Sequence, residues 1–185
     1  MNAQSSPQSV TTQRRTPLAG RWSVVGELSA GRFQVRDKLV TTTRGSMPVE
    51  RGAVSVSTQG ELGEAWVDLS VAGIATANEH RDSHLREQRF LDATTHPTVR
   101  VAVREATVAS DGWTAAAVVH ARGSEAPVDL TAEIVALSSD EIRLRVSGRL
   151  DRMPLRIKAP TFIVGRFLDL EADLTFRRDQ APTEP

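Results

Sequence analysis

Apolar and polar residues alternate along most of this sequence, and this alternation limits the possible folds more than any other feature. Phe33 and Val35 alternate with Arg and Gln, and Val54 and Val56 alternate with Ser. Successive side chains of a β-strand point to opposite faces, so this pattern predicts strands with one buried and one solvated face. The alternation recurs in the segments 21–28, 65–71, 98–105, 113–121, 128–137, 140–150 and 168–176.

Eight or nine such strands with almost no helix must bury their apolar faces against one another, either in a two-sheet sandwich or in a closed barrel. We favour an all-β fold with an eight-stranded barrel. Its interior would consist mainly of Val, Leu and Ala, because aromatic residues make up only 4% of the chain. The interior of such a barrel holds side chains or one small ligand, and short side chains leave more room for the ligand.

Composition excludes several functional classes. The 185 residues include 23 basic and 23 acidic ones that are not gathered into blocks, so nucleic acid is not predicted as a partner. Cysteine is absent, which excludes disulfides, thiolate metal sites and a cysteine nucleophile. No apolar stretch approaches the ~20 residues that a membrane-spanning helix requires, so no membrane span is predicted.

The two ends of the chain differ in composition from its middle. Residues 1–16 are almost entirely polar, and the last residues are rich in Pro and polar side chains. We predict a disordered tail over 1–16, a second disordered tail over 179–185, and one β-barrel domain over 17–178. The pair Arg14–Arg15 precedes no apolar segment of the length that an export signal needs, so we predict a cytoplasmic location.

The segment 76–97 interrupts the strand pattern. Thr76 is followed three residues later by Glu, which is the spacing of a helix capping box. We predict a short helix near residues 79–89. The simplest interpretation of its charges is a latch that holds the helix across one barrel end while Phe90 and Leu91 insert into the core.

The same segment contains residues that can take part in catalysis or metal binding. His80 and His84 have the i,i+4 spacing that can direct two imidazoles at one metal ion. Arg81 stands where a metalloprotease has Glu, and no third ligand is recognisable, so we predict no metal site. Motifs for a phosphate loop, a nucleophile elbow and a dinucleotide site are absent, so we predict no enzyme activity and no cofactor. An enzyme acting near His84 and Asp82 is the lowest-ranked alternative.

These residues bring the sequence close to a known pattern. The segment closely resembles the signature T-x-N-x-x-R-D-x-H-L-[RK]-x-x-x-F-[FL]-D-x-x-x-[HY]-P of the YceI-like family. The residues that carry this structural motif are Thr76, Asn78, Arg81, Asp82, His84, Leu85, Phe90, Asp92 and Pro97. Gly20 and Trp22 resemble the opening strand of that family, and the resemblance covers about residues 18–178.

The resemblance implies a fold and a ligand. Members of the family form a lipocalin-like, mostly antiparallel eight-stranded barrel whose apolar interior holds a long-chain lipid, typically a polyisoprenoid or an isoprenoid quinone precursor. The sequence departs from the family pattern at 26–29, where a histidine is missing, and at 151–155, where a Phe-Gly element is replaced. If these elements shape the cavity entrance, the ligand differs from that of the best-known relatives, or is absent.

We therefore expect a non-catalytic lipid-binding protein that serves as a carrier, store or sensor. The apolar lumen is assigned to Phe33, Val35, Val54, Val56, Val67, Leu69, Val71, Val99, Val101, Val103, Leu144, Val146 and Leu170. The alternative is an interaction or stress-response scaffold whose barrel is filled by its own side chains and binds no lipid. Trp66 is out of phase with the apolar face of its strand, so it is expected on the outer surface, where it would mark a homodimer contact if exposed.

Overall fold

The computed structural model describes residues 18–36, 42–157 and 165–179, and both predicted tails lie outside these residues except for Asp179. The helical elements are η1 (Gly26–Leu28), α1 (Glu79–Arg86) and η2 (Met153–Leu155). The strands are β1 (Gly20–Val24), β2 (Ala30–Arg36), β3 (Thr42–Val56), β4 (Leu62–Ser70), β5 (Thr98–Ala109), β6 (Gly112–Ala121), β7 (Ser124–Leu137), β8 (Glu141–Asp151) and β9 (Phe167–Arg178).

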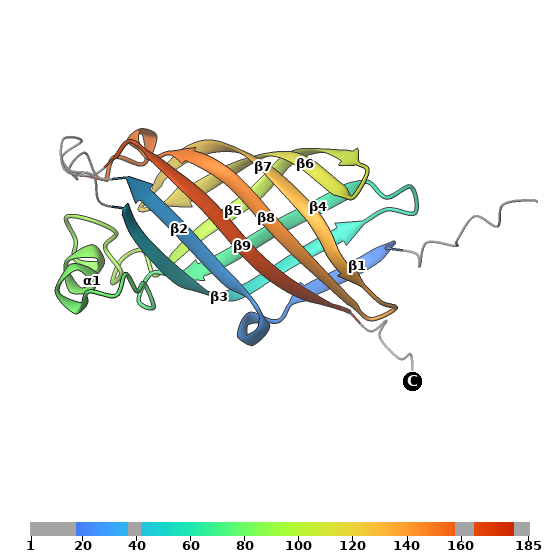
Figure 1. Ribbon diagram of the computed structural model, residues 1–185, viewed down its shortest axis with the longest axis horizontal. Coiled ribbons are helices and arrows are strands. Elements are labelled where there is room, and N and C mark those ends of the chain that lie inside the picture. The colour runs from blue at the N-terminus through green and yellow to red at the C-terminus, as the bar shows by residue number, and fades with distance from the viewer. Residues whose placement is uncertain (1–17, 37–41, 158–164, 180–185) are drawn as a thin grey trace, which may run out of the picture.

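The strands close into one antiparallel barrel (Figure 1). From β3 to β9 each strand pairs with its neighbour in sequence. The short strands β1 and β2 together fill the eighth position, because each of them pairs with β3 on one side and with β9 on the other. The predicted eight-stranded barrel is therefore confirmed, and the sandwich alternative is wrong.

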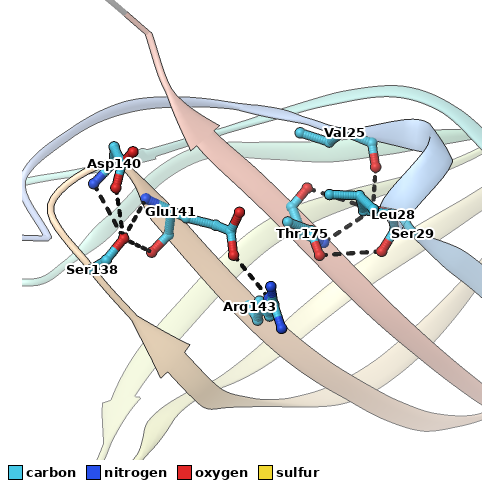
Figure 2. A network of polar contacts seen from close by, with 8 residues as sticks. All are labelled: Val25, Leu28, Ser29, Ser138, Asp140, Glu141, Arg143 and Thr175. Atoms are coloured by element: carbon cyan, nitrogen blue, oxygen red, sulfur yellow. Dashed lines mark hydrogen bonds and ion pairs between the residues drawn. The ribbon is translucent and has the colours of Figure 1, made fainter.

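A turn of 3-10 helix separates β1 from β2, where the sequence pattern had predicted one strand over 21–28. That prediction was wrong, because residues 26–28 form a turn whose polar groups bond to Ser29 and Thr175 and do not form a strand ladder (Figure 2). The Ser29 hydroxyl donates to the Val25 carbonyl at 2.8 Å and accepts from the Thr175 amide at 3.0 Å. The Thr175 hydroxyl donates to the Leu28 carbonyl at 3.1 Å. These bonds satisfy polar groups that the break in the strand would otherwise leave unpaired.

The turn between β7 and β8 is held by the side chain of Ser138. The Ser138 hydroxyl donates to Asp140 Oδ1 at 2.8 Å and accepts from the Glu141 amide at 3.0 Å (Figure 2). The hydrogen bond from Ser138 lowers the pKa of the Asp140 carboxyl. A short polar side chain that binds the backbone two or three residues later is a typical turn former.

An ion cluster on the outer wall joins three neighbouring strands. Asp68 of β4 is fully buried although it points away from the interior, because two arginines cover it. Arg100 of β5 donates to both carboxylate oxygens at 2.6 and 2.8 Å, and Arg51 of β3 donates to Oδ2 at 2.8 Å. The Arg100 guanidinium also lies 4.4 Å from the ring centroid of Trp66. Trp66 thus lies on the outer wall, as predicted, but it is partly covered by Arg100.

Replacing Ser29 with Ala should destabilise the barrel by about 1–3 kcal/mol, because the buried amide of Thr175 loses its acceptor. Urea unfolding followed by intrinsic tryptophan fluorescence measures the change. Ser23→Ala, at an exposed serine of β1, is the matched control and should stay within about 0.5 kcal/mol of the parent. Equal unfolding midpoints for the two variants would show that the Ser29 bonds do not hold the strand break.

Asp68→Asn removes the negative charge that Arg51 and Arg100 bind, so it should lower the free energy of unfolding at pH 7. The loss should be only about 1 kcal/mol, because water screens the two exposed guanidinium groups. The hydrogen bonds from Arg100 hold the pKa of Asp68 below its usual value. The carboxylate therefore adds stability above its unfolded pKa of about 3.9, and this contribution is lost as the pH falls through the lower folded pKa. The difference between parent and variant should shrink below pH 4, and a constant difference down to pH 2 would contradict this origin.

Candidate functional site

The interior of the barrel is closely packed at the end opposite α1. Trp22 and Ile142 are 0% and 1% exposed, and Trp113 and Phe176 are 3% exposed. Both indole N–H groups are satisfied, since Trp22 donates to the Leu18 carbonyl at 2.9 Å and Trp113 donates to the Gly60 carbonyl at 3.0 Å. These large side chains close this end of the barrel, and we call Trp22, Trp113, Ile142 and Phe176 the floor.

Nearer to α1, the inward-facing side chains include both buried and half-buried residues. Several of them remain half-buried, although their alternation directs them into the barrel and they contact the core clusters across it. We call these residues the upper tier: Phe33, Val67, Leu69, Val99, Val101, Val103, Val146 and Leu170. Beside β5, the part of β6 that follows Trp113 contributes only small or β-branched inward residues, namely Ala115, Ala117, Val119 and Ala121, which are 3–9% exposed. The half-buried upper tier and these buried residues of β6 together line this half of the barrel.

The remaining residues assigned to the lumen lie in better packed surroundings. Val54, Val56 and Leu144 belong to the floor cluster, and Val71 belongs to the cluster beneath the segment of α1. Val35 is buried near the end of β2. Sequence alternation found the inward phase of these strands but carried no information on how deep each residue lies.

Two segments cover the α1 end of the barrel. Ile74 and Leu91, from the connection between β4 and β5, are 2% and 8% exposed, and Leu155 of η2 is 4% exposed. Ile157 packs both against the cluster of Leu155 and against the cluster of Ile74 and Leu91. Figure 1 shows α1 and the orange turn η2 at this same end. Leu91 inserts as predicted, whereas Phe90 stays half-buried with the Arg89 guanidinium 5.2 Å from its ring.

The sequence motif forms the hydrogen-bond network that holds α1. The Asn78 side chain caps the helix by accepting from the Arg81 amide at 2.9 Å, so the predicted capping box at Thr76 was wrong. Thr76 instead donates its amide to Asp82 Oδ1 at 2.9 Å and also donates its hydroxyl to that oxygen. Arg81 donates to the Thr76 hydroxyl and carbonyl, each at 2.7 Å. Bonding from Thr76 lowers the pKa of Asp82, which keeps its carboxylate ionised.

The other motif residues shape the path back to β5. Asp92 adopts a left-handed backbone conformation, with φ of 52°, and its carbonyl accepts from the His96 amide at 2.7 Å. The Pro97 carbonyl accepts from the Val71 amide at 2.9 Å, and Leu85 of α1 packs against the cluster of Val71, Ile74 and Leu91. These contacts agree with the latch interpretation of the segment.

Geometry does not support catalysis at this segment. The Asp82 carboxylate is bound to Thr76. The His84 side chain faces Glu87 instead, with 3.7 Å between His84 Nε2 and Glu87 Oε1. The rings of His80 and His84 are 4.2 Å apart. Among residues 18–36, 42–157 and 165–179 there is no group of three or more His, Cys, Asp or Glu that could hold a metal ion.

Sequence reasoning missed two residues that hold the covered end of the barrel. Arg152 is 5% exposed and donates to the Gly165 carbonyl at 2.8 Å, which fixes the chain after β8 beside the start of β9. Burial lowers the pKa of this guanidinium. Ile157 joins the two covers. Neither residue lies in an alternating segment, so periodicity gave no signal for them.

The fold and interior place the protein among small, closed, antiparallel β-barrels with an apolar interior. The sequence profile of the YceI-like domain matches residues 22–178. The chain therefore belongs to the YceI-like family, as its motif predicted.

Solved structures agree with this assignment. Burkholderia cenocepacia BcnA has a TM-score of 0.69 and 14% identity over 82% of this chain and 98% of its own. A Saccharophagus degradans protein, described as a polyisoprenoid binding domain implicated in plant cell wall breakdown, has a TM-score of 0.67 and 14% identity over 85% of this chain and 98% of its own. The Campylobacter jejuni YCEI protein has a TM-score of 0.68 and 15% identity over 76% of this chain and 88% of its own. At these identities the likeness concerns the fold. A search of curated proteins finds no match.

Asp82→Ala should release α1 while the barrel stays folded. Thr76 then loses the acceptor of its amide and hydroxyl, so hydrogen exchange should quicken at residues 74–86 and remain slow in β7 and β8. Ser83→Ala, at an exposed neighbouring position, should leave exchange unchanged. Undisturbed protection of the Thr76 amide in Asp82→Ala would contradict the latch.

Proposed function

We propose that this protein binds one long apolar lipid, of the polyisoprenoid or isoprenoid-quinone type, in the upper half of its barrel and without catalysis. The observation that carries the proposal is the contrast between the solid floor and the half-buried upper tier. The lipid would lie along Val101, Val103 and Leu170, with its tail toward the floor and its polar end toward α1. The protein would then act as a carrier, store or sensor of that lipid.

The energetics suit such a ligand. Each CH₂ group moved from water into an apolar interior contributes about 0.8 kcal/mol, so about ten enclosed carbons outweigh much of the association entropy. No hydrogen bond to the tail is required, and the upper tier offers none. Selection would therefore depend on tail length and width, both limited by the floor at Trp22 and Trp113.

Family and fold support the proposal. The chain belongs to the YceI-like family, and a structural neighbour from Saccharophagus degradans is described as a polyisoprenoid binding domain. In the part of the chain that the structure describes, no helix has the length and apolarity to cross a bilayer. The cytoplasmic location remains a prediction from sequence, as does the homodimer.

Val101→Phe tests the lumen directly. In a hollow upper tier the larger ring occupies the lipid's place, so the variant should fold with unchanged or higher stability and should lose its bound lipid. In a barrel filled by its own side chains the same change overpacks the core and costs about 1–3 kcal/mol. Organic extraction and native mass spectrometry of purified protein measure the lipid, and thermal unfolding measures the stability.

The matched control is Val118→Phe, which places the same side chain on the outer face of β6. It should retain the lipid found in the parent protein. If the parent yields no lipid from any expression host and Val101→Phe is destabilised, the lipid proposal fails and the scaffold alternative is favoured.

A further inference from the structure

Apolar and basic side chains are exposed together at the α1 end of the barrel. We call this group the rim patch, and it consists of Arg36, Met153, Arg156, Arg166 and Phe167. Met153 is 46% exposed and Phe167 is 42% exposed, although large apolar side chains in this barrel are mostly inside. In Figure 1 the orange turn that carries Met153, the end of β2 and the start of β9 lie at one end of the molecule.

The backbone fixes these side chains outward. Phe167 is the outward partner of Asp151, and the next residue, Leu168, points into the barrel. In η2 the residues Arg152 and Leu155 are buried, which leaves Met153 on the solvent side. The bond from Arg152 to the Gly165 carbonyl at 2.8 Å ties the turn to the start of β9. The patch is thus presented on anchored backbone.

Guanidinium groups surround the exposed ring. Arg149 and Arg166 lie 4.7 and 5.3 Å from the centroid of Phe167. Their charges have acidic neighbours, since Arg166 donates to Asp151 at 2.6 Å and Arg149 is 3.9 Å from Asp169. Asp129 lines a shallow hollow beside Phe167 and is a third carboxylate near the patch.

Two further arginines give the patch its excess of positive charge. Arg36 and Arg156 are both exposed, and neither has a carboxylate within 4 Å in the described part of the chain. The backbone of Arg36 lies directly against Gly165, so this arginine belongs to the same rim. Arg156 adopts a left-handed backbone conformation with φ of 55°, which glycine would take without strain.

We propose that the rim patch docks the protein on an anionic phospholipid surface. Met153 and Phe167 would enter the boundary between head groups and acyl chains, while Arg36 and Arg156 would approach lipid phosphates. The inference rests on the proposed lipid-binding function, because this orientation turns the covered end of the barrel toward the membrane from which a lipid would come.

Vesicle flotation tests the proposal on the full chain. The parent should bind vesicles of phosphatidylcholine with 30% phosphatidylglycerol, and binding should weaken as salt is raised from 0.05 to 0.5 M. Arg36→Gln with Arg156→Gln should lower partitioning about thirtyfold, at roughly a factor of five per arginine. Arg104→Gln with Arg177→Gln removes the same charge from other parts of the wall and should leave partitioning within about twofold. The rim patch would be overturned as the docking site if both double variants lost vesicle binding equally. It would also be overturned if the parent bound pure phosphatidylcholine vesicles as well as anionic ones.

A label reports the orientation. The chain has no cysteine, so Met153→Cys carries a single environment-sensitive fluorophore. Its emission should shift to the blue on anionic vesicles, whereas a label at Leu28→Cys, an exposed site on the side wall, should not shift. Equal shifts at both positions would contradict an end-on docking.

The two proposals fail in different ways. Val101→Phe should lose its lipid but float with anionic vesicles as the parent does. A parent that contains lipid yet binds no vesicle would overturn the rim patch alone, with a protein partner as the remaining occupant. A parent that binds vesicles through the rim patch yet never contains lipid would overturn the lumen proposal alone.

Discussion

Closure of the barrel is the constraint on which the rest of the structure depends. Because β1 and β2 each pair with both β3 and β9, the sheet closes on itself, and every alternating strand directs its apolar face inward. The volume enclosed is then divided by side-chain size alone. Trp22, Trp113 and Phe176 fill one end, whereas Val, Leu and Ala together with Phe33 line the other half.

The ends of the barrel are closed by different means. At the floor, bulky side chains of the strands themselves meet, and hydrogen bonds to indole nitrogens fix them. At the α1 end, two connections fold inward and contribute Ile74, Leu91 and Leu155. Polar bonds such as those between Thr76 and Asp82 hold one of these connections in place. The floor is thus held by packing between strands, whereas the α1 end is held by buried side chains of the two connections together with polar bonds.

Much of the fold followed from sequence because period-two alternation is a local property that a closed barrel uses directly. The inward phase of β2, β5, β8 and β9 was visible in the order of residues alone. The break at η1 was not, because Ser29 is held by Thr175, a residue 146 positions away. Asp68 looked like any polar residue on the wet face of a strand, and its burial depends on arginines from two other strands. Depth within the lumen, which separates Val56 from Val101, is equally a property of closure.

The position of Ile157 has a mechanical consequence. Because this one side chain packs under both covers, neither connection can lift without removing apolar contacts from the other. The two covers are therefore coupled through apolar packing and should not loosen independently. A substitution in either connection should consequently weaken the packing of both.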